Sequence, residues 1–172
     1  KALAEAGMTD KSVHLPEDTS EEELVELIER LNKDNTVNGI LVQLPLPKHI
    51  NEDRVITAIT PEKDVDGFHP VNVGNLMIGR KAFLPCTPHG VIVLLEKMNI
   101  ETSGKHCVII GRSNIVGKPL AILMSSKKVN STVTICHTGT KDIESIVKQA
   151  DIIVAAAGHP MTVTKQMVKP GA

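Results

Sequence analysis

Apolar residues between positions 18 and 34 recur every three or four positions, which is the spacing of one face of an α-helix. They are Leu24, Leu27, Ile28 and Leu31. Ser20 precedes this stretch with Glu23 three positions later, a capping-box arrangement in which each side chain bonds the backbone N–H of the other residue. The pattern predicts a helix that begins just after Ser20.

The next hydrophobic pattern, residues 39–44, is a continuous apolar run in which Gln43 is the one polar residue. A run of this length without alternation predicts a strand buried on both faces. A glutamine amide in such a strand costs free energy unless it is hydrogen-bonded, so Gln43 needs either a backbone partner or a polar site. The residues alone leave both interpretations open.

A short helix follows, with Asn51 placed to cap its start and Ile59 near its end. Residues 62–75 contain Gly and Pro at positions that predict an irregular loop, which is a usual place for function. Asp64 and Asp66 in this loop could bind a metal ion, but no His or Cys cluster supports them, and acids before Gly commonly form turns. We therefore expect no metal site.

Helix and strand patterns alternate through the second half of the chain. They predict helices at about 88–98, from 115, at 140–150 and near 163, and strands at 106–111, 132–136 and 151–157. Such alternation is typical of an α/β fold with a parallel sheet covered on both faces. A change of pattern at residues 85–87 places the expected boundary between two α/β units, 1–84 and 85–172.

The two ends of the sequence predict a chain that is truncated at both of them. KALAEAG at the start is typical of the middle of a helix. MVKPGA at the end stops where a helix would lead into a strand. We therefore expect a piece of a longer protein.

Composition excludes several classes of function. The 172 residues include 19 Lys and Arg against 20 Asp and Glu, and this near-neutral chain offers no broad field for nucleic acid or an anionic membrane. Aromatic residues make up 1%, too few for base-stacking platforms. The three cysteines are odd in number and widely spaced, which disfavours disulfides and zinc, predicts small core residues and fits the reducing cytoplasm. No apolar run is long enough for a membrane span.

The segment VIIGRSNIVGKP has the layout of a phosphate-binding turn between a strand and a helix. Gly111 would permit the tight turn, Gly117 would permit close approach of helix and strand, and the helix N-terminus would direct N–H groups at a pyrophosphate. Ser113 occupies the place of the second glycine of the usual motif. A plain strand-to-helix turn would also need a glycine, so the motif alone leaves both interpretations open.

The end of the second strand favours NADP over NAD. Enzymes that prefer NAD usually present an acid there to the ribose hydroxyl, whereas residues 136–138 read Cys-His-Thr. Arg112 in the first turn could meet a phosphate with its fork of donors, although a solvated surface arginine is the alternative.

Four motifs occur in register along the chain: GILVQLPLP, PEKDVDGFHPVNVG, PCTPHG and GRSNIVGKP. Together they resemble the bifunctional methylenetetrahydrofolate dehydrogenase/methenyltetrahydrofolate cyclohydrolase family over essentially the whole chain. The resemblance implies a small α/β folate-site domain followed by a Rossmann-like NADP-binding domain, both with mainly parallel sheets. It also implies a cytoplasmic homodimer that acts on tetrahydrofolate derivatives in one-carbon metabolism, without nucleic acid or membrane partners.

The resemblance also implies roles for individual residues. Gln43 would support a catalytic lysine, and Asp66 would bind the pterin end of folate. Cofactor contacts would come from Gly111, Arg112, Ser113 and Thr138.

Two departures from the family pattern concern the site. The family commonly has Ser where this chain has Thr138, which keeps the hydroxyl and adds a methyl group. The catalytic lysine belongs to a Tyr-x-x-x-Lys-x-Lys-Ala pattern that this chain joins only at Lys1, which matches the second lysine. The expected activity is NADP-dependent oxidation followed by hydrolysis of the methenyl product. A monofunctional dehydrogenase or a catalytically dead NADP-binding subunit remains the alternative.

Overall fold

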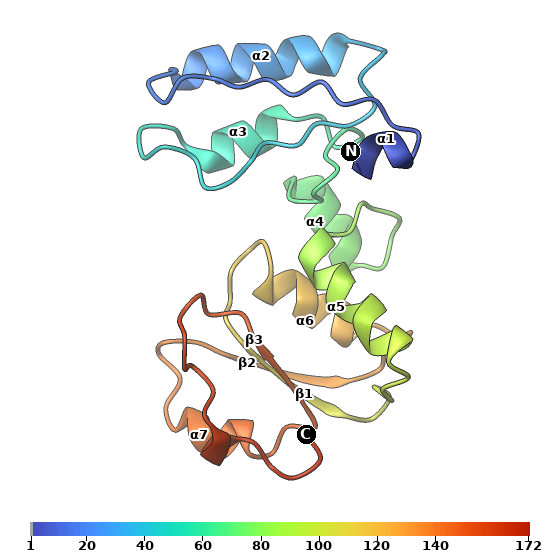
Figure 1. The fold of residues 1–172 in the computed structure, drawn as a ribbon, viewed down its shortest axis with the longest axis vertical. Coiled ribbons are helices and arrows are strands. Elements are labelled where there is room, and N and C mark those ends of the chain that lie inside the picture. Colours follow the sequence, from blue (N-terminus) through green and yellow to red (C-terminus); the bar gives the residue numbers. More distant parts are fainter. Residues whose placement is uncertain (1) are drawn as a thin grey trace.

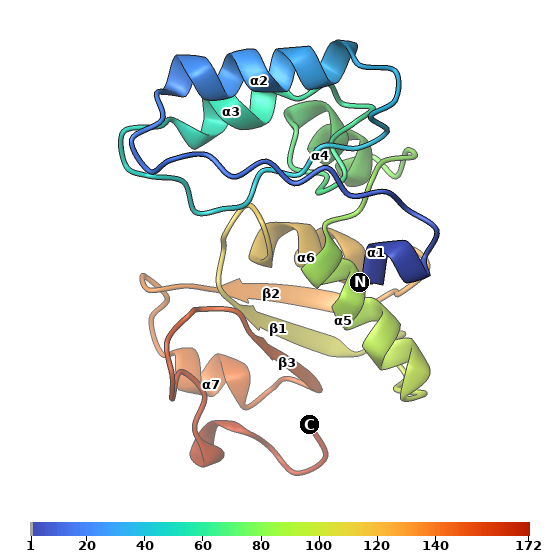
Figure 2. The same ribbon diagram turned by 45° about the horizontal axis from the view of Figure 1, so that its top comes forward.

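The computed structural model describes residues 2–172 and contains two groups of elements, one around helices α2 and α3 and one around a three-stranded sheet (Figures 1 and 2). The helices are α1 (Ala2–Glu5), α2 (Glu21–Lys33), α3 (Glu52–Ala58), α4 (Pro70–Met77), α5 (Cys86–Lys97), α6 (Gly117–Met124) and α7 (Ile143–Val147). The strands are β1 (His106–Ile110), β2 (Thr132–Cys136) and β3 (Ile152–Ala155), and a 3₁₀ turn covers Lys165–Met167. No described helix is long and apolar enough to cross a membrane.

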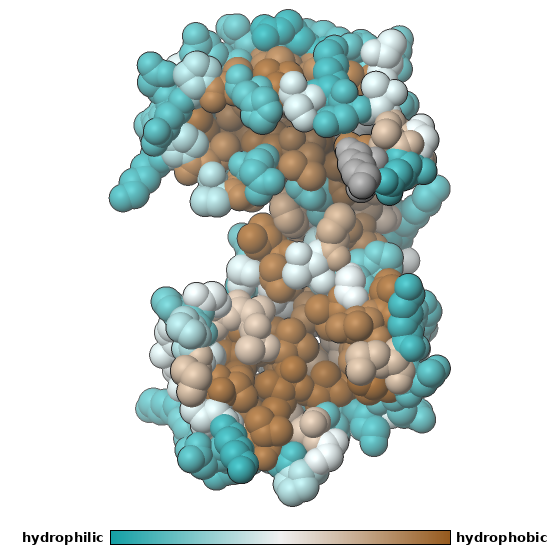
Figure 3. Space-filling view, in the orientation of Figure 1, coloured by the Kyte–Doolittle hydropathy of each residue, from teal (hydrophilic) through white to brown (hydrophobic). Residues whose placement is uncertain are grey.

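Helix α2 begins where the sequence predicts, because both halves of the capping box form. The Glu23 N–H donates to Ser20 Oγ at 3.2 Å, and the Ser20 N–H donates to Glu23 Oε2 at 2.9 Å. Its apolar face packs on α3 in a core of Leu24, Ile28, Ile40, Ile50, Val55 and Ile59. Apolar side chains also gather on the surface of both groups of elements (Figure 3).

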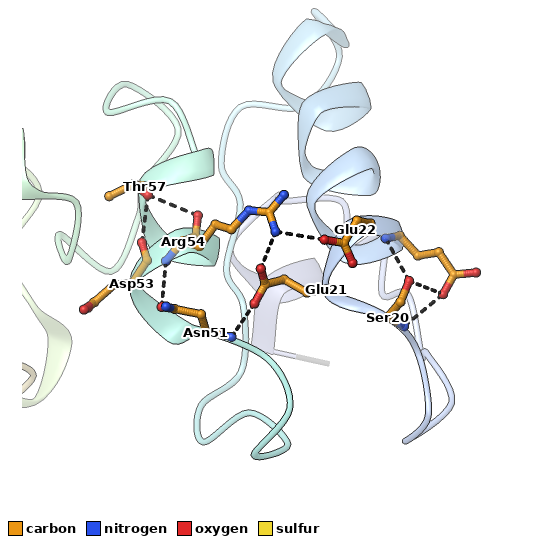
Figure 4. A network of polar contacts seen from close by, with 8 residues as sticks. Ser20, Glu21, Glu22, Asn51, Asp53, Arg54 and Thr57 are labelled. Atoms are coloured by element: carbon orange, nitrogen blue, oxygen red, sulfur yellow. Dashed lines mark hydrogen bonds and ion pairs between the residues drawn. The ribbon is translucent and has the colours of Figure 1, made fainter.

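A polar network fastens the start of α3 beside the start of α2 (Figure 4). The Glu21 carboxylate accepts a hydrogen bond from the Asn51 N–H at 2.6 Å and pairs with the Arg54 guanidinium, which also contacts Glu22 at 3.0 Å. These bonds, with Asn51 first and Arg54 next, hold the pKa of Glu21 below its usual range. The predicted Asn51 cap is confirmed, since its side chain accepts from the Arg54 N–H.

The strand expected at residues 39–44 is reduced to one parallel bridge between Ile40 and Asp64. The Ile40 N–H donates to the Lys63 carbonyl at 2.7 Å, and no other described segment extends the pairing. Ile40 is buried while Leu41 is 58% exposed, so the expectation of burial on both faces is wrong. A strand buried on both faces needs partner strands along its whole length, whereas the described residues pair with this run at Ile40 alone.

The loop expected at residues 62–75 contains a helix, α4, over its second half. Proline occupies the first helical position, where its fixed φ is favourable and its missing N–H costs nothing. The His69 side chain caps the helix by accepting from the Val71 N–H at 3.1 Å. The prediction of an irregular loop is therefore wrong from Pro70 onward, because a proline interrupts a helix in its interior but favours the first helical position.

The second half confirms the predicted α/β architecture. Its strands form one parallel sheet in the order β2-β1-β3, with α5 and α6 on one face and α7 on the other (Figures 1 and 2). Successive residues of β1 point to opposite faces of the sheet. Cys107 and Ile109 pack toward α5 and α6, whereas Val108 and Ile110 pack toward α7. Helix α7 is shorter than the predicted 140–150, and the helix expected near 163 is the 3₁₀ turn.

The cysteines divide between the core and the surface. Cys107 and Cys136 are fully buried in the sheet, as predicted. Cys86 is exposed, so the expectation that all three are core residues is wrong there. Helix α5 begins at Cys86, two residues earlier than expected, and places this side chain in its first turn.

Candidate functional site

The carboxyl ends of the three parallel strands meet at one edge of the sheet. Ile110 lies opposite Cys136 of β2 and Ala155 of β3, so the chain leaves all three strands at the same level. The Gly111 N–H donates to the Cys136 carbonyl, and the Ala156 N–H donates to the Ile110 carbonyl, each at 2.8 Å. This edge, where connections leave for opposite faces of the sheet, is the usual ligand position in open α/β folds.

The turn after β1 has room for glycine alone at two positions. Gly111 has φ +135°, and a Cβ atom on it would lie 2.5 Å from the Ala156 carbonyl oxygen. A Cβ on Gly117 would collide with the Gly111 carbonyl oxygen and lie 2.7 Å from its carbon. Helix α6 therefore starts in backbone contact with the turn, which is the close packing that the sequence motif predicts.

Ser113 organises this turn by capping α6. Its Oγ accepts hydrogen bonds from the N–H groups of Val116 at 3.1 Å and Gly117 at 3.3 Å. The first N–H groups of the helix are thus occupied, unlike in the sequence-based expectation. Within residues 2–172, the backbone N–H groups of residues 112–115 donate to no other residue. The free donors therefore lie in the turn before α6 and not in the first turn of the helix itself.

The other expected cofactor residues lie near the same edge. Arg112 and Thr138 are both exposed, in the segments that follow β1 and β2. The turn after β2 is held by His137, whose N–H donates to Thr140 Oγ1 at 2.8 Å and whose Nδ1 accepts from the Gly139 N–H at 3.0 Å. Sequence reasoning missed this role of His137 and Thr140, because side chain to backbone bonds in a turn leave little trace in hydrophobic patterning.

The two aspartates of the 62–75 segment lie in different surroundings. Asp64 is 2% exposed, and its Oδ2 accepts from the His69 N–H and from Asn72 Nδ2, each at 2.8 Å. Asp66 is half-buried and has no hydrogen-bond partner for its carboxylate among the described residues. Burial, and next the charge of Asp64, raise the pKa of Asp66. Asp64 is therefore a buried and hydrogen-bonded acid.

Gln43 is exposed, and its Nε2 donates to the adjacent Leu44 carbonyl at 2.9 Å. The expectation of a buried amide is therefore wrong, because the described residues pair with this apolar run at Ile40 alone and leave Gln43 exposed. Of the two interpretations left by the sequence, the backbone partner is the one present. Lys1, which the resemblance aligns with a family lysine, lies outside the described residues.

No expected site residue lines the open cleft beside α2. An open cleft of about 610 Å³ lies between residues 13–19 and α2 and is lined by Leu15, Glu23, Leu27 and Arg30 among others. Within residues 2–172, no three His, Cys, Asp or Glu side chains are grouped in a way that could hold a metal ion.

A glycine turn at the carboxyl edge of a parallel sheet defines the class of nucleotide-binding α/β domains. Residues 85–172 match the family described as tetrahydrofolate dehydrogenase/cyclohydrolase, NAD(P)-binding domain, and residues 1–66 match its catalytic domain. The chain belongs to this tetrahydrofolate dehydrogenase/cyclohydrolase family.

Relatives and solved structures agree with this assignment. The chain is 60% identical over 168 residues to the bifunctional protein FolD of Ruminiclostridium cellulolyticum, covering 98% of this chain and 58% of that protein. It superposes on the FolD crystal structure from Campylobacter jejuni with TM-score 0.93 and 48% identity, covering 98% of this chain and 59% of that one. The Trypanosoma brucei enzyme, solved with NADP and an inhibitor, gives TM-score 0.91 and 41% identity over 98% of this chain and 57% of that one. The chain thus spans less than two thirds of these relatives.

Proposed function

We propose that the full-length protein oxidises methylenetetrahydrofolate to methenyltetrahydrofolate with NADP and hydrolyses the product to formyltetrahydrofolate. The observation that carries this proposal is the turn 111–117, in which two glycines let helix α6 start against the end of β1, in a member of this family. The Campylobacter jejuni and Trypanosoma brucei structures are described as methylenetetrahydrofolate dehydrogenase/cyclohydrolase, and the Ruminiclostridium relative as a bifunctional protein.

NADP fits the carboxyl edge of the sheet. The free N–H groups of residues 112–115 suit a pyrophosphate, and Arg112 and Thr138 suit an added phosphate on the ribose. The described turn after β2 has no acid before Asp142 that would repel that phosphate. When bound, NADP supplies the acceptor for a hydride from the folate.

Asp66 is the group we assign to the pterin end of the folate. Its carboxylate is half-buried and has no hydrogen-bond partner among residues 2–172, so two N–H groups on a pterin edge can donate to it. Gln43 is assigned to orient an amine that removes a proton from the attacking water. Among the described residues, its exposed amide bonds only the neighbouring Leu44 carbonyl, so it can exchange that bond without exposing buried apolar residues.

We further propose that the two units divide between residues 84 and 85, that the protein is a homodimer, and that it acts in the cytoplasm. The division is supported by separate hydrophobic cores, one around α2 and α3 and two on the faces of the sheet. The dimer rests on the family resemblance.

The test is turnover by the full-length protein supplied with methylenetetrahydrofolate and NADP. We expect NADPH to form in equal amounts with oxidised folate, and added methenyltetrahydrofolate to be hydrolysed without cofactor. Dehydrogenation without hydrolysis would support a monofunctional enzyme. Binding of both ligands without turnover would support a catalytically dead subunit and contradict the proposal.

A further inference from the structure

Asp64 and Asn72 form a buried side-chain pair that sequence motifs do not reveal. Both side chains are almost completely buried, at 2% and 5% exposure, and Asn72 Nδ2 lies 2.8 Å from Asp64 Oδ2. Asn72 Nδ2 also lies 2.8 Å from the Pro61 carbonyl, and the same Asp64 oxygen accepts from the His69 N–H. The pair therefore ties the two ends of the segment 61–69 to helix α4.

The segment is anchored again on its other side, toward α2. Lys63 Nζ donates to three carbonyls at the end of that helix, those of Leu31 at 3.0 Å, Asn32 at 2.7 Å and Asp34 at 2.8 Å. The Lys63 carbonyl accepts from the Ile40 N–H. A cation on the last carbonyls of a helix is favourably placed in the helix dipole, so this anchor resists displacement.

The chain directly after Asp66 has little freedom. Gly67 has φ +68°, and a Cβ on it would collide with the Phe83 carbonyl oxygen. Asp66 thus stands between the anchored Asp64 and a glycine packed against another backbone. Its carboxylate, unlike that of Asp64, has no hydrogen-bond partner within the described chain, and it is less exposed than the other unengaged acid of the segment, Glu62.

We propose that Asp64 is a positioning residue, which together with Asn72 holds the 61–69 segment so that the Asp66 carboxylate meets the folate at a fixed place. This inference rests on the proposed function, in which Asp66 binds the pterin. A displacement of about 1 Å in such a group can cost a hundredfold in rate, so a rigid support has a measurable effect. The burial and the nearby Asp64 charge that raise the pKa of Asp66 agree with two acids held close together.

The test is a double-mutant cycle in the full-length enzyme between Asn72→Ala and Asp66→Asn. Asn72→Ala should weaken binding of a folate analogue about tenfold and leave NADP affinity within about twofold. Asn72→Ala added to Asp66→Asn should have no further effect on folate binding, because the group that Asn72 positions is already altered. Asn75→Ala, on the same helix but without a side-chain hydrogen bond among the described residues, should change neither affinity.

A rescue experiment separates positioning from general loss of structure. Asp64→Asn keeps an oxygen that can accept from the His69 N–H and Asn72, so it should retain folate affinity within about threefold, whereas Asp64→Ala should lose about tenfold. If Asn72→Ala does not fold, Asn72→Leu, which removes the donor but nearly keeps the side-chain volume, replaces it in the cycle. Additive effects of Asn72 and Asp66 substitutions, or equal loss of NADP binding, would overturn the inference. If Asp66→Asn alone leaves folate binding unchanged, the assignment of Asp66 fails first.

Discussion

Gly117 at the start of α6 lies in backbone contact with Gly111 at the end of β1, with no space for a side chain between them. The contact brings the first turn of a helix against the turn that leaves a central strand. Ser113 lies between the two glycines and caps the helix with its hydroxyl. Among the described residues, the N–H groups of residues 112–115 donate to no other residue, and the proposed cofactor site depends on these donors.

Gly117→Ala should destabilise the protein and impair cofactor binding. The added methyl group meets backbone atoms that cannot rotate away, and overpacking of this kind costs roughly 2 kcal/mol. Denaturant midpoints and NADP titrations of the full-length protein measure the two effects. Gly90→Ala is the matched control, because its Cβ would meet open space in helix α5 and should leave NADP affinity unchanged. Equal behaviour of the two variants would contradict the close contact at Gly117.

Arg112→Ala should raise the KM for NADP about tenfold and change the KM for NAD by less than about twofold, because we propose that the guanidinium binds the extra phosphate of NADP. Steady-state kinetics with both cofactors measure the ratio. Arg80→Ala removes another exposed arginine, in the segment after α4, and should alter neither KM. A parallel rise for both cofactors would show that Arg112 does not distinguish them.

Asp66→Asn should weaken folate binding by about one to two powers of ten, since a charge-assisted pair of hydrogen bonds contributes roughly 1.5–3 kcal/mol. Asp64→Asn should weaken it less, because the buried oxygen contacts survive the substitution. Titration with a folate analogue measures both, and repetition with a chelator checks the expectation of no metal. Loss of binding on chelation, or a larger effect at Asp64, is the opposite of what we expect.

Burial raises the pKa of the Cys107 thiol to about 11. The folded state therefore holds this proton at pH values where the unfolded chain, with a pKa near 9, releases it. The contribution of Cys107 to stability is complete below about pH 9 and declines as the pH rises toward 11. Denaturant midpoints of Cys107→Ala and wild type should converge over this range. A thiol reagent should modify exposed Cys86 in the native protein and Cys107 only after unfolding.

The sequence predicts those parts of the fold that depend on local pattern. The capping box fixes the start of α2, and the apolar run of β1 fixes the central strand, since both signals lie within a few residues. Helix α4 was missed because Pro70 ends most helices yet favours the first position of one.

The candidate site is less predictable because the burial and hydrogen bonding of its residues depend on partners that are distant in the sequence. Asp64 is buried and hydrogen-bonded to Asn72 of α4, and the hydrophobic pattern does not predict this helix. Gln43 lies in an apolar run that gives no information about which neighbours cover it, and one side is open. The glycine turn was predicted because close backbone contact demands glycine at fixed spacing.

Transfer of an isotopic label tests the central claim most directly. The full-length protein is supplied with NADP and methylenetetrahydrofolate carrying two deuterium atoms on the methylene carbon, and the products are analysed by mass spectrometry. The account predicts one deuterium in the reduced cofactor and one retained on the formyl carbon, because a hydride passes from that carbon before water adds to it. A reduced cofactor without deuterium, or a formyl group that keeps none, would contradict it.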